Sequence, residues 1–128
     1  MDKKIAVITP VKHLEGVVEL LQSKGDVVFY ETASKEEIRG LLLQTPIDTL
    51  VCNPNQQTYK IDKELLENTN IKIINSCSTG LNHIDLDYCK NNNIRIQCHK
   101  NDYELINQLP STSELAFGLM LSLLRNIP

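Results

Sequence analysis

Short runs of apolar, often β-branched residues recur five times along this chain of 128 residues, and each is followed by a segment with the spacing of a helix. Runs of four or five such residues are typical of buried strands. Strands that alternate with helices pair in parallel, because a helical crossover and not a hairpin joins them. The alternation therefore predicts an α/β domain, with strands at residues 5–9, 26–30, 49–52, 71–75 and 94–98.

Helix signals fill the gaps between these runs. Ser34 and Glu37 have the spacing of a capping box, and Pro46 ends the helix that they begin. Asp62 can cap a short helix, and Gly25 is expected to end the first helix of the chain. The expected helices cover residues 13–23, 34–45, 62–66, 85–90 and 111–126, with an irregular segment at 99–110.

Five strand–helix units favour one arrangement. Because crossovers are right-handed, we expect a flavodoxin-like, doubly wound parallel five-stranded sheet with helices on both faces. Ligands of such sheets bind outside the carboxyl ends of the strands, at the switch point. The loops after the third and fourth strands, residues 53–57 and 76–82, are therefore the candidate site.

Composition narrows the classes of function. Thirteen Lys and Arg residues against sixteen Asp and Glu give a net charge of −3, and the basic residues are scattered, so nucleic-acid binding is not expected. A secretory leader is not expected, because no apolar h-region follows the first four residues. The longest apolar stretch, residues 115–124, is shorter than the ~20 residues that span a bilayer. We therefore expect a cytoplasmic protein without a membrane partner.

The four cysteines stand at positions 52, 77, 89 and 98, and none of them forms a C-x-x-C pair. Reduced thiols that pack as small apolar groups are the expected state. Cys98 and His99 come nearest to a metal-binding pair, but neighbouring residues of a strand point to opposite faces. No metal site is expected.

The last expected helix is apolar around nearly its whole circumference. Ser111 and Glu114 have the spacing of a second capping box at its start. A helix on the surface of a lone domain has one apolar stripe, whereas a helix that is apolar all round is buried on every side. We therefore expect it to pack on another body, either a second copy of the chain or a domain outside this sequence. Its apolar residues are Leu115, Ala116, Phe117, Leu119, Met120, Leu121, Leu123 and Leu124.

The loop at residues 76–82 is the most informative candidate for chemistry, because small and polar residues there join a buried strand to a helix. Its successive amides, with Gly80 able to adopt a positive φ, can form an anion-binding nest. The helix N-terminus that follows adds positive potential. A carboxylate or a phosphate would suit this loop. The alternative is that its small residues serve tight packing alone.

Five ordered segments of the second half carry a family pattern: IKII at 71–74, STGLNHIDL at 78–86, NIRI at 93–96, SELA at 113–116 and RNIP at 125–128. From residue 65 to 128 the chain resembles the D-isomer-specific 2-hydroxyacid dehydrogenases, which include phosphoglycerate, formate, glycerate and D-lactate dehydrogenases. That family has a strand, a G-x-G-x-D-x-I-D loop, a G-I-x-V strand and a V-A-E-L helix ending in R-x-I-P. The first half of the chain is similar only in its alternation of strands and helices.

The loop departs from the family pattern at two positions. Ser78 stands where the family has its first loop glycine, and Asn82 stands where the family has aspartate. Asn82 removes a charge but keeps a hydrogen-bonding cap. His83 is not the catalytic histidine of the family, and we expect it to be a surface residue at the helix N-terminus.

The resemblance implies that amides of the loop hold the carboxylate of a small 2-hydroxy or 2-keto acid, and that Thr79 also approaches the nicotinamide of NAD. The loop after the third strand would line the substrate side of the cleft, with a plain Asn/Pro turn as the alternative. The candidate substrate-binding residues are Ser78, Thr79, Gly80, Asn53, Pro54 and Asn55.

Missing motifs limit what this chain can do by itself. The family binds NAD through a G-x-G-x-x-G turn in a Rossmann domain, and the glycines present here cannot form one. No arginine here matches the catalytic arginine of the family, so no catalytic residue is expected. The resemblance implies a substrate domain at residues 1–110. Residues 111–128 would lead to a Rossmann domain outside this sequence, and the helix at 111–126 would form a homodimer.

Two functions remain open at this point. The chain is expected to be the substrate-binding part of an NAD-dependent D-2-hydroxyacid dehydrogenase and to be inactive alone, because the nicotinamide supplies the hydride chemistry. The alternative is a stand-alone flavodoxin-like module that binds a small anion or a partner without catalysis. A receiver-type signalling domain is not expected, because Pro10 and Asn53 stand where it needs acidic residues.

Overall fold

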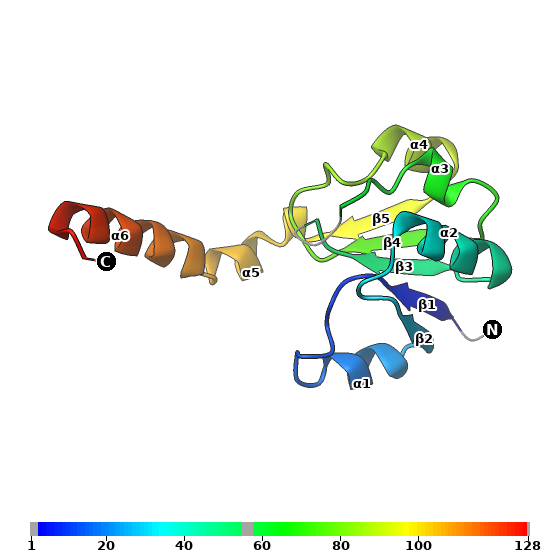
Figure 1. The fold of residues 1–128 in the computed structure, drawn as a ribbon, viewed down its shortest axis with the longest axis horizontal. Coiled ribbons are helices and arrows are strands. Elements are labelled where there is room, and N and C mark those ends of the chain that lie inside the picture. The colour runs from blue at the N-terminus through cyan, green and yellow to red at the C-terminus, as the bar shows by residue number, and fades with distance from the viewer. Residues whose placement is uncertain (1–2, 55–57, 128) are drawn as a thin grey trace. The chain divides into compact units, whose positions relative to one another are not determined.

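The structure is a computed structural model that describes residues 3–54 and 58–127. The chain divides into two compact units, Met1–Cys98 and His99–Pro128. The first unit holds the sheet and four helices, and the second is helical (Figure 1). In the described part of the chain, no helix is both long enough and apolar enough to cross a membrane.

All five expected strands are present and form one parallel sheet in the order β2-β1-β3-β4-β5. This order confirms the doubly wound, flavodoxin-like prediction. The strand order reverses between β1 and β3, so the switch point lies there. The strands are β1 (Lys4–Val7), β2 (Asp26–Phe29), β3 (Thr49–Cys52), β4 (Ile73–Ser76) and β5 (Arg95–Cys98).

Helices cover both faces of this sheet (Figure 1). Ile5 and Val7 of β1 pack with α1 on one face, and Ala6 between them packs with the other helices on the opposite face. This alternation is the period of two that a strand imposes on its side chains. The helices of this unit are α1 (Val17–Gln22), α2 (Lys35–Gln44), α3 (Lys63–Leu66) and α4 (Leu86–Asn91).

The expected caps of α2 and α3 are formed. Ser34 Oγ accepts from the Glu37 amide at 3.2 Å, and Glu37 Oε2 accepts from the Ser34 amide at 2.7 Å, which completes the capping box. Asp62 Oδ1 accepts from the Leu65 amide at 3.2 Å at the start of α3. These side chains supply partners for helix amides that have none within the helix.

The first helix is shorter than expected. It begins at Val17, after Gly16 in the left-handed conformation with φ 75°, and not at residue 13. The prediction that Gly25 ends this helix is wrong, because the helix ends at Gln22 with Ser23 as its C-cap. A Cβ on Gly25 would lie 2.2 Å from the carbonyl oxygen of Lys3. Gly25 therefore permits the close approach of two backbones at the start of β2.

The prediction that the thiols pack as small apolar groups of the core is confirmed for two of the four and wrong for Cys77. Cys52 and Cys89 are buried, whereas Cys77 is exposed and Cys98 is half-buried. Burial raises the pKa of Cys52 to about 12 and that of Cys89 to about 11. Both core thiols are therefore protonated and unreactive near neutral pH.

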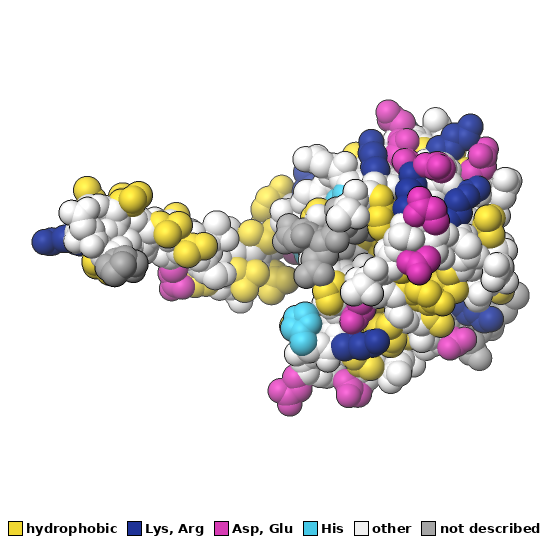
Figure 2. All heavy atoms as spheres, in the orientation of Figure 1, with side chains coloured by type: hydrophobic (Ala, Val, Ile, Leu, Met, Phe, Trp, Pro, Cys, Tyr) yellow, Lys and Arg dark blue, Asp and Glu magenta, His cyan; other side chains and the backbone are white. Residues whose placement is uncertain are grey.

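The second unit differs from expectation in two places. The segment at 99–110 is not irregular, because it contains the 3-10 turn η1 (His99–Asn101) and α5 (Tyr103–Asn107). The last helix, α6 (Ser111–Arg125), begins where expected, but its N-cap is Pro110 and the predicted capping box of Ser111 and Glu114 is not formed. The apolar side chains of α6 are exposed in this chain, Leu123 to 80% (Figure 2).

Candidate functional site

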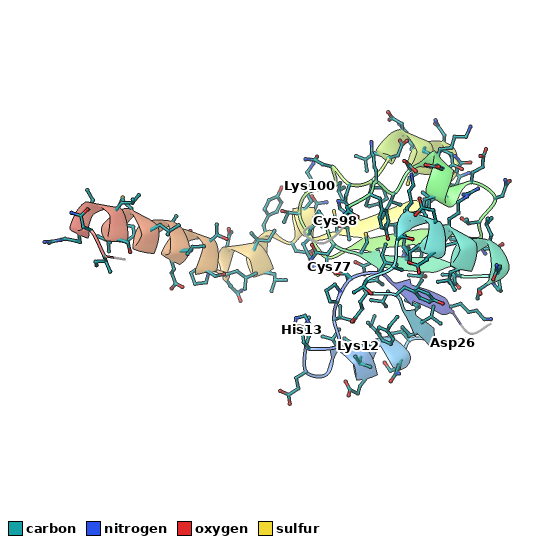
Figure 3. The ribbon with its side chains drawn as sticks, viewed as in Figure 1. Lys12, His13, Asp26, Cys77, Cys98 and Lys100 are labelled. Atoms are coloured by element: carbon teal, nitrogen blue, oxygen red, sulfur yellow. The ribbon has the colours of Figure 1, made fainter. Side chains whose placement is uncertain are left out.

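The two predicted loops meet at the carboxyl edge of the sheet, where β3 and β4 end. The Cys77 amide donates to the Cys52 carbonyl at 2.8 Å, and Asn53 Nδ2 donates to the Cys77 carbonyl at 3.3 Å. Cys77 marks this end of β4 in Figure 3. Asn53 and Pro54 are half-buried there. Asn55, the third candidate of this loop, lies outside the described residues.

Residues 78–80, here called the Ser78 loop, present two unused donors. Thr79 and Gly80 are exposed, and within the described residues no acceptor receives a hydrogen bond from either backbone amide. The Ser78 amide differs from them, because it donates to the Ser76 carbonyl at 2.8 Å. These two unused donors, on exposed residues, are thus the candidate part of the predicted anion site.

Gly80 does not use the conformational freedom that the sequence suggested. Its φ lies outside the left-handed region. Gly16 is the one glycine of the chain with a positive φ. A Cβ built on Gly80 meets nothing within 4 Å. The glycine therefore leaves open space above the loop, and the nest with a positive φ at Gly80 is not formed.

His83 is the residue of this site that sequence reasoning misplaced. It stands three positions before the first residue of α4, but it is half-buried and not a surface residue. Its Nε2 atom lies 3.1 Å from Ser76 Oγ and 3.6 Å from Cys52 Sγ, and its carbonyl accepts from the Ile61 amide at 2.8 Å. The isolated parallel bridge between Ile61 and Ile84 brings the ring inward, and no local sequence signal announces that pairing.

The interior of the site is uncharged near neutral pH. Burial lowers the pKa of His83, which favours the neutral imidazole. Burial raises the pKa of Cys52 to about 12 and partial loss of solvent raises that of Cys77, so both thiols are mainly protonated near neutral pH. In the parts of the chain that the structure describes, no group of three or more metal-binding side chains gathers. This site can therefore bind and orient a ligand through neutral donors.

A second loop at the same edge was not predicted. Glu31 Oε1 accepts from the amides of Val11 and Lys12 at 3.0 and 3.2 Å, which fixes the loop after β1. The hydrogen bond from Val11 is the largest cause that lowers the pKa of Glu31. Lys12 and His13 are exposed on this loop (Figure 3), at the strand that flanks the switch point. The ammonium of Lys12 lies 5.2 Å from the centroid of the Phe29 ring, so this loop places a cation beside the end of β2.

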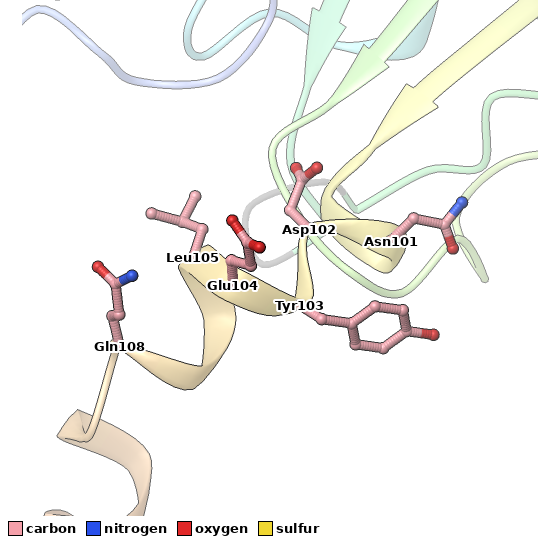
Figure 4. A pocket seen from close by; sticks show the side chains of 6 residues that line it. All are labelled: Asn101, Asp102, Tyr103, Glu104, Leu105 and Gln108. Atoms are coloured by element: carbon pink, nitrogen blue, oxygen red, sulfur yellow. The ribbon is translucent and has the colours of Figure 1, made fainter.

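The second unit has a shallow hollow of its own (Figure 4). All of the side chains that line it are exposed and come from one short helical segment. Among the described residues no side chain outside 101–108 lines it, so it is an open surface and not a built site. The lining residues are Asn101, Asp102, Tyr103, Glu104, Leu105 and Gln108.

The parallel sheet with helices on both faces defines the class as an α/β domain, and the loop at its carboxyl edge is its candidate ligand-binding site. Residues 5–103 match the family described as "D-isomer specific 2-hydroxyacid dehydrogenase, catalytic domain". The chain belongs to this family, as its motifs suggested.

Comparison with individual proteins supports the same family. Over 29 residues the chain is 55% identical to erythronate-4-phosphate dehydrogenase of Hahella chejuensis. This matched segment is 23% of this chain and 8% of that protein. The PH0520 protein from Pyrococcus horikoshii OT3 superimposes with a TM-score of 0.70 at 27% identity, covering 99% of this chain and 35% of that one.

D-lactate dehydrogenase from Aquifex aeolicus, solved with NAD and lactic acid, shares the fold with a TM-score of 0.65 at 21% identity. That match covers 94% of this chain and 33% of that one. The chain thus spans about a third of the length of the solved structures that it matches.

Proposed function

We propose that this chain is the substrate-binding part of an NAD-dependent D-2-hydroxyacid dehydrogenase and that it has no turnover alone. The single observation behind the proposal is the pair of exposed, unused amides at Thr79 and Gly80, in a loop that lies within the family match. Two adjacent N–H groups suit one carboxylate, since hydrogen bonds to a charged acceptor are stronger than those between neutral groups.

In this proposal each loop has a separate task. The amides of Thr79 and Gly80 hold the carboxylate of a 2-hydroxy or 2-keto acid, and Ser78 shapes the loop through its own bonds. Asn53 and Pro54 line the substrate side of the cleft, where Asn53 already donates to the carbonyl of Cys77. Holding the acid in one orientation is the contribution of this domain to the rate.

The dinucleotide needs more than this chain offers. A bound nicotinamide would supply or accept the hydride at C2 of the acid, and only Thr79 is proposed to lie beside it. The sequence lacks the G-x-G-x-x-G turn that holds a pyrophosphate, so we assign that task to a Rossmann domain beyond these residues. Residues 1–110 would then be the substrate domain, and residues 111–128 the connection.

The exposed apolar side chains of α6 support a further part of the proposal. A helix with Phe117, Leu119 and Leu123 each more than half exposed has apolar surface on several sides. We propose that the Rossmann domain and a second copy of the chain bury these apolar side chains, through residues 111–126. A cytoplasmic location completes the proposal, since the four thiols are free.

The first test titrates the ¹⁵N-labelled chain with D-lactate and follows the backbone amides by NMR. Propionate is the matched control, because it has the carboxylate and the carbon chain but no 2-hydroxyl group. We expect D-lactate and propionate to shift Thr79 and Gly80 alike, because these amides hold the carboxylate that the two acids share, and inorganic phosphate to shift them less. Equal responses to D-lactate, propionate and inorganic phosphate would favour the alternative, a stand-alone anion-binding module.

Two further measurements address activity and domain organisation. The chain is expected to give no saturable NADH oxidation with pyruvate or another 2-keto acid, and such oxidation would refute its inactivity. An immunoblot of the source cells is expected to show a band of about twice the mass of this chain or more, as a second domain of ordinary size requires. A band at 14.5 kDa would overturn the assignment of a covalently linked Rossmann domain.

A further inference from the structure

Three side chains and one carbonyl group form an unbroken hydrogen-bonded series beneath the Ser78 loop. His83 Nε2 lies 3.1 Å from Ser76 Oγ, and Ser76 Oγ lies 2.8 Å from Ser78 Oγ. Ser78 Oγ donates to the carbonyl oxygen of Gly80 at 2.7 Å. Ser76 is fully buried and His83 and Ser78 are half-buried, so the series runs from the interior to the exposed loop.

The chemistry of the last group fixes the direction of every bond. A carbonyl oxygen only accepts, so the single hydroxyl hydrogen of Ser78 is used on Gly80. Ser78 Oγ must then accept the hydrogen of Ser76, and Ser76 Oγ must in turn accept from His83 Nε2. The ring is therefore protonated on Nε2, and its Nδ1 atom carries the lone pair.

The surroundings of Nδ1 agree with this tautomer. Nδ1 is buried and has no hydrogen-bond partner among the described residues, so a proton placed there would have no acceptor. Among the described residues, the titratable group in contact with the ring is the Cys52 thiol of β3, which also forms a hydrogen bond with Ser76. No described carboxylate or amine forms an ion pair with the ring. No described acidic group therefore stabilises the charged imidazolium form of His83.

We propose that His83 is a positioning residue that, as the neutral Nε2–H tautomer, donates through Ser76 and Ser78 to hold the Gly80 carbonyl and so to aim the Thr79 and Gly80 amides. The use of these amides on a carboxylate rests on the proposed function, whereas the direction of the hydrogen bonds does not. The bond from the Ile61 amide to the His83 carbonyl holds the backbone of His83, so that the ring can orient the loop.

The first test needs no variant. Two-bond ¹⁵N–¹H correlation of the imidazoles in the intact chain distinguishes a protonated ring nitrogen from one with a lone pair. We expect Nε2 of His83 to be protonated and Nδ1 to be bare at pH 7. His13 and His99 are exposed and serve as internal references. An Nδ1–H tautomer or a charged His83 ring at pH 7 would overturn the proposal.

The second test compares two amide side chains at position 83. In His83→Gln the side-chain NH₂ can reach the position of Nε2 and donate to Ser76, whereas the shorter side chain of His83→Asn reaches only the position of Nδ1. We expect the ¹⁵N order parameters of Thr79 and Gly80 to stay near ~0.85 in the Gln variant and to fall below ~0.6 in the Asn variant. Equal order parameters in the two variants would contradict the positioning role.

Acid supplies a readout that a purely structural side chain would not change. Protonation of Nδ1 leaves the Nε2–H donor in place but puts a charge on a half-buried ring whose Nδ1 has no partner among the described residues. We therefore expect the charged ring to leave its site at acid pH and the Ser78 loop to loosen, a step that His83→Gln is expected to lack. Ser78→Ala interrupts the series at its accessible end and is expected to loosen the loop at every pH. An identical pH profile in the wild-type chain and in His83→Gln would refute the role of the ring.

The ligand titration separates failure of this inference from failure of the proposed function. If D-lactate shifts the Thr79 and Gly80 amides equally in the wild type and in His83→Asn, the positioning role fails and the proposed function stands. If His83→Asn loosens the loop but D-lactate perturbs no loop amide in the wild type, the positioning role stands and the proposed function fails. Loss of D-lactate shifts in His83→Asn with their recovery in His83→Gln supports both.

Discussion

Replacement of Gly25 by alanine is expected to destabilise the sheet unit by about 2–4 kcal/mol. The new Cβ would lie 2.2 Å from the Lys3 carbonyl oxygen, which is a backbone atom that cannot rotate away. Displacing a packed backbone costs about 1–3 kcal/mol. The same carbonyl accepts from the Asp26 amide at 2.8 Å, and losing that bond adds about 0.5–1.5 kcal/mol.

Two other glycines provide matched controls. Gly80→Ala meets nothing within 4 Å and has no positive φ, so it is expected to be neutral or to stabilise the chain by up to about 1 kcal/mol. Gly16 has equally open surroundings but a φ of +75°, so its alanine variant is expected to cost about 1–2 kcal/mol. The expected order of destabilisation is therefore Gly25, then Gly16, then Gly80.

Urea unfolding followed by far-UV circular dichroism measures these differences as shifts in the midpoint at a common slope. The β1–β2 pair, with Lys4 opposite Asp26, should lose amide protection first in Gly25→Ala. If the free energies of unfolding of Gly25→Ala and Gly80→Ala differ by less than about 0.5 kcal/mol, the close-approach explanation is refuted. Surface substitutions without a specific cause change stability by no more than that amount.

The remaining predictions concern a cap, a carboxylate and a thiol. Ser34→Ala removes the capping box of α2 and is expected to cost about 1 kcal/mol in the same urea assay. The amide of Val11 helps to hold the pKa of Glu31 below 4.5, so the advantage of the wild type over Glu31→Gln is expected above pH 4.5 and should vanish as acid titrates the folded carboxylate. Iodoacetamide is expected to label exposed Cys77 and to spare buried Cys52 until the chain unfolds, which peptide mass mapping would check.

The sheet could be predicted because its signals are local. The apolar run of β3, Thr49–Cys52, agrees with its predicted bounds, and the order of the strands follows from the handedness of the crossovers. The meeting of two loops at one edge follows from the parallel direction of the strands alone. The contact between Asn53 and the Cys77 carbonyl is a consequence of that geometry.

The parts that sequence reasoning missed depend on register or on distant pairing. Pro110 has helical dihedral angles, so α6 includes Ser111 as its first residue and the spacing of Ser111 and Glu114 no longer matches a cap. The helix α5 has only five residues, too few for an apolar period to be recognised. The inward position of His83 depends on the bridge from Ile61 to Ile84, between residues far apart in sequence.

The neutrality of the Ser78 loop limits how tightly this chain can hold an acid. Its two unused amides, at Thr79 and Gly80, would contribute about 1.5–3 kcal/mol each on a carboxylate. Association alone costs about 4–15 kcal/mol, so the sum does not reach the roughly 4 kcal/mol of a millimolar complex. We therefore expect D-lactate to bind the isolated chain with a Kd above about 1 mM, measured by NMR titration. A micromolar Kd would refute this limit and show that a charged group, such as Lys12 of the loop after β1, also contacts the acid.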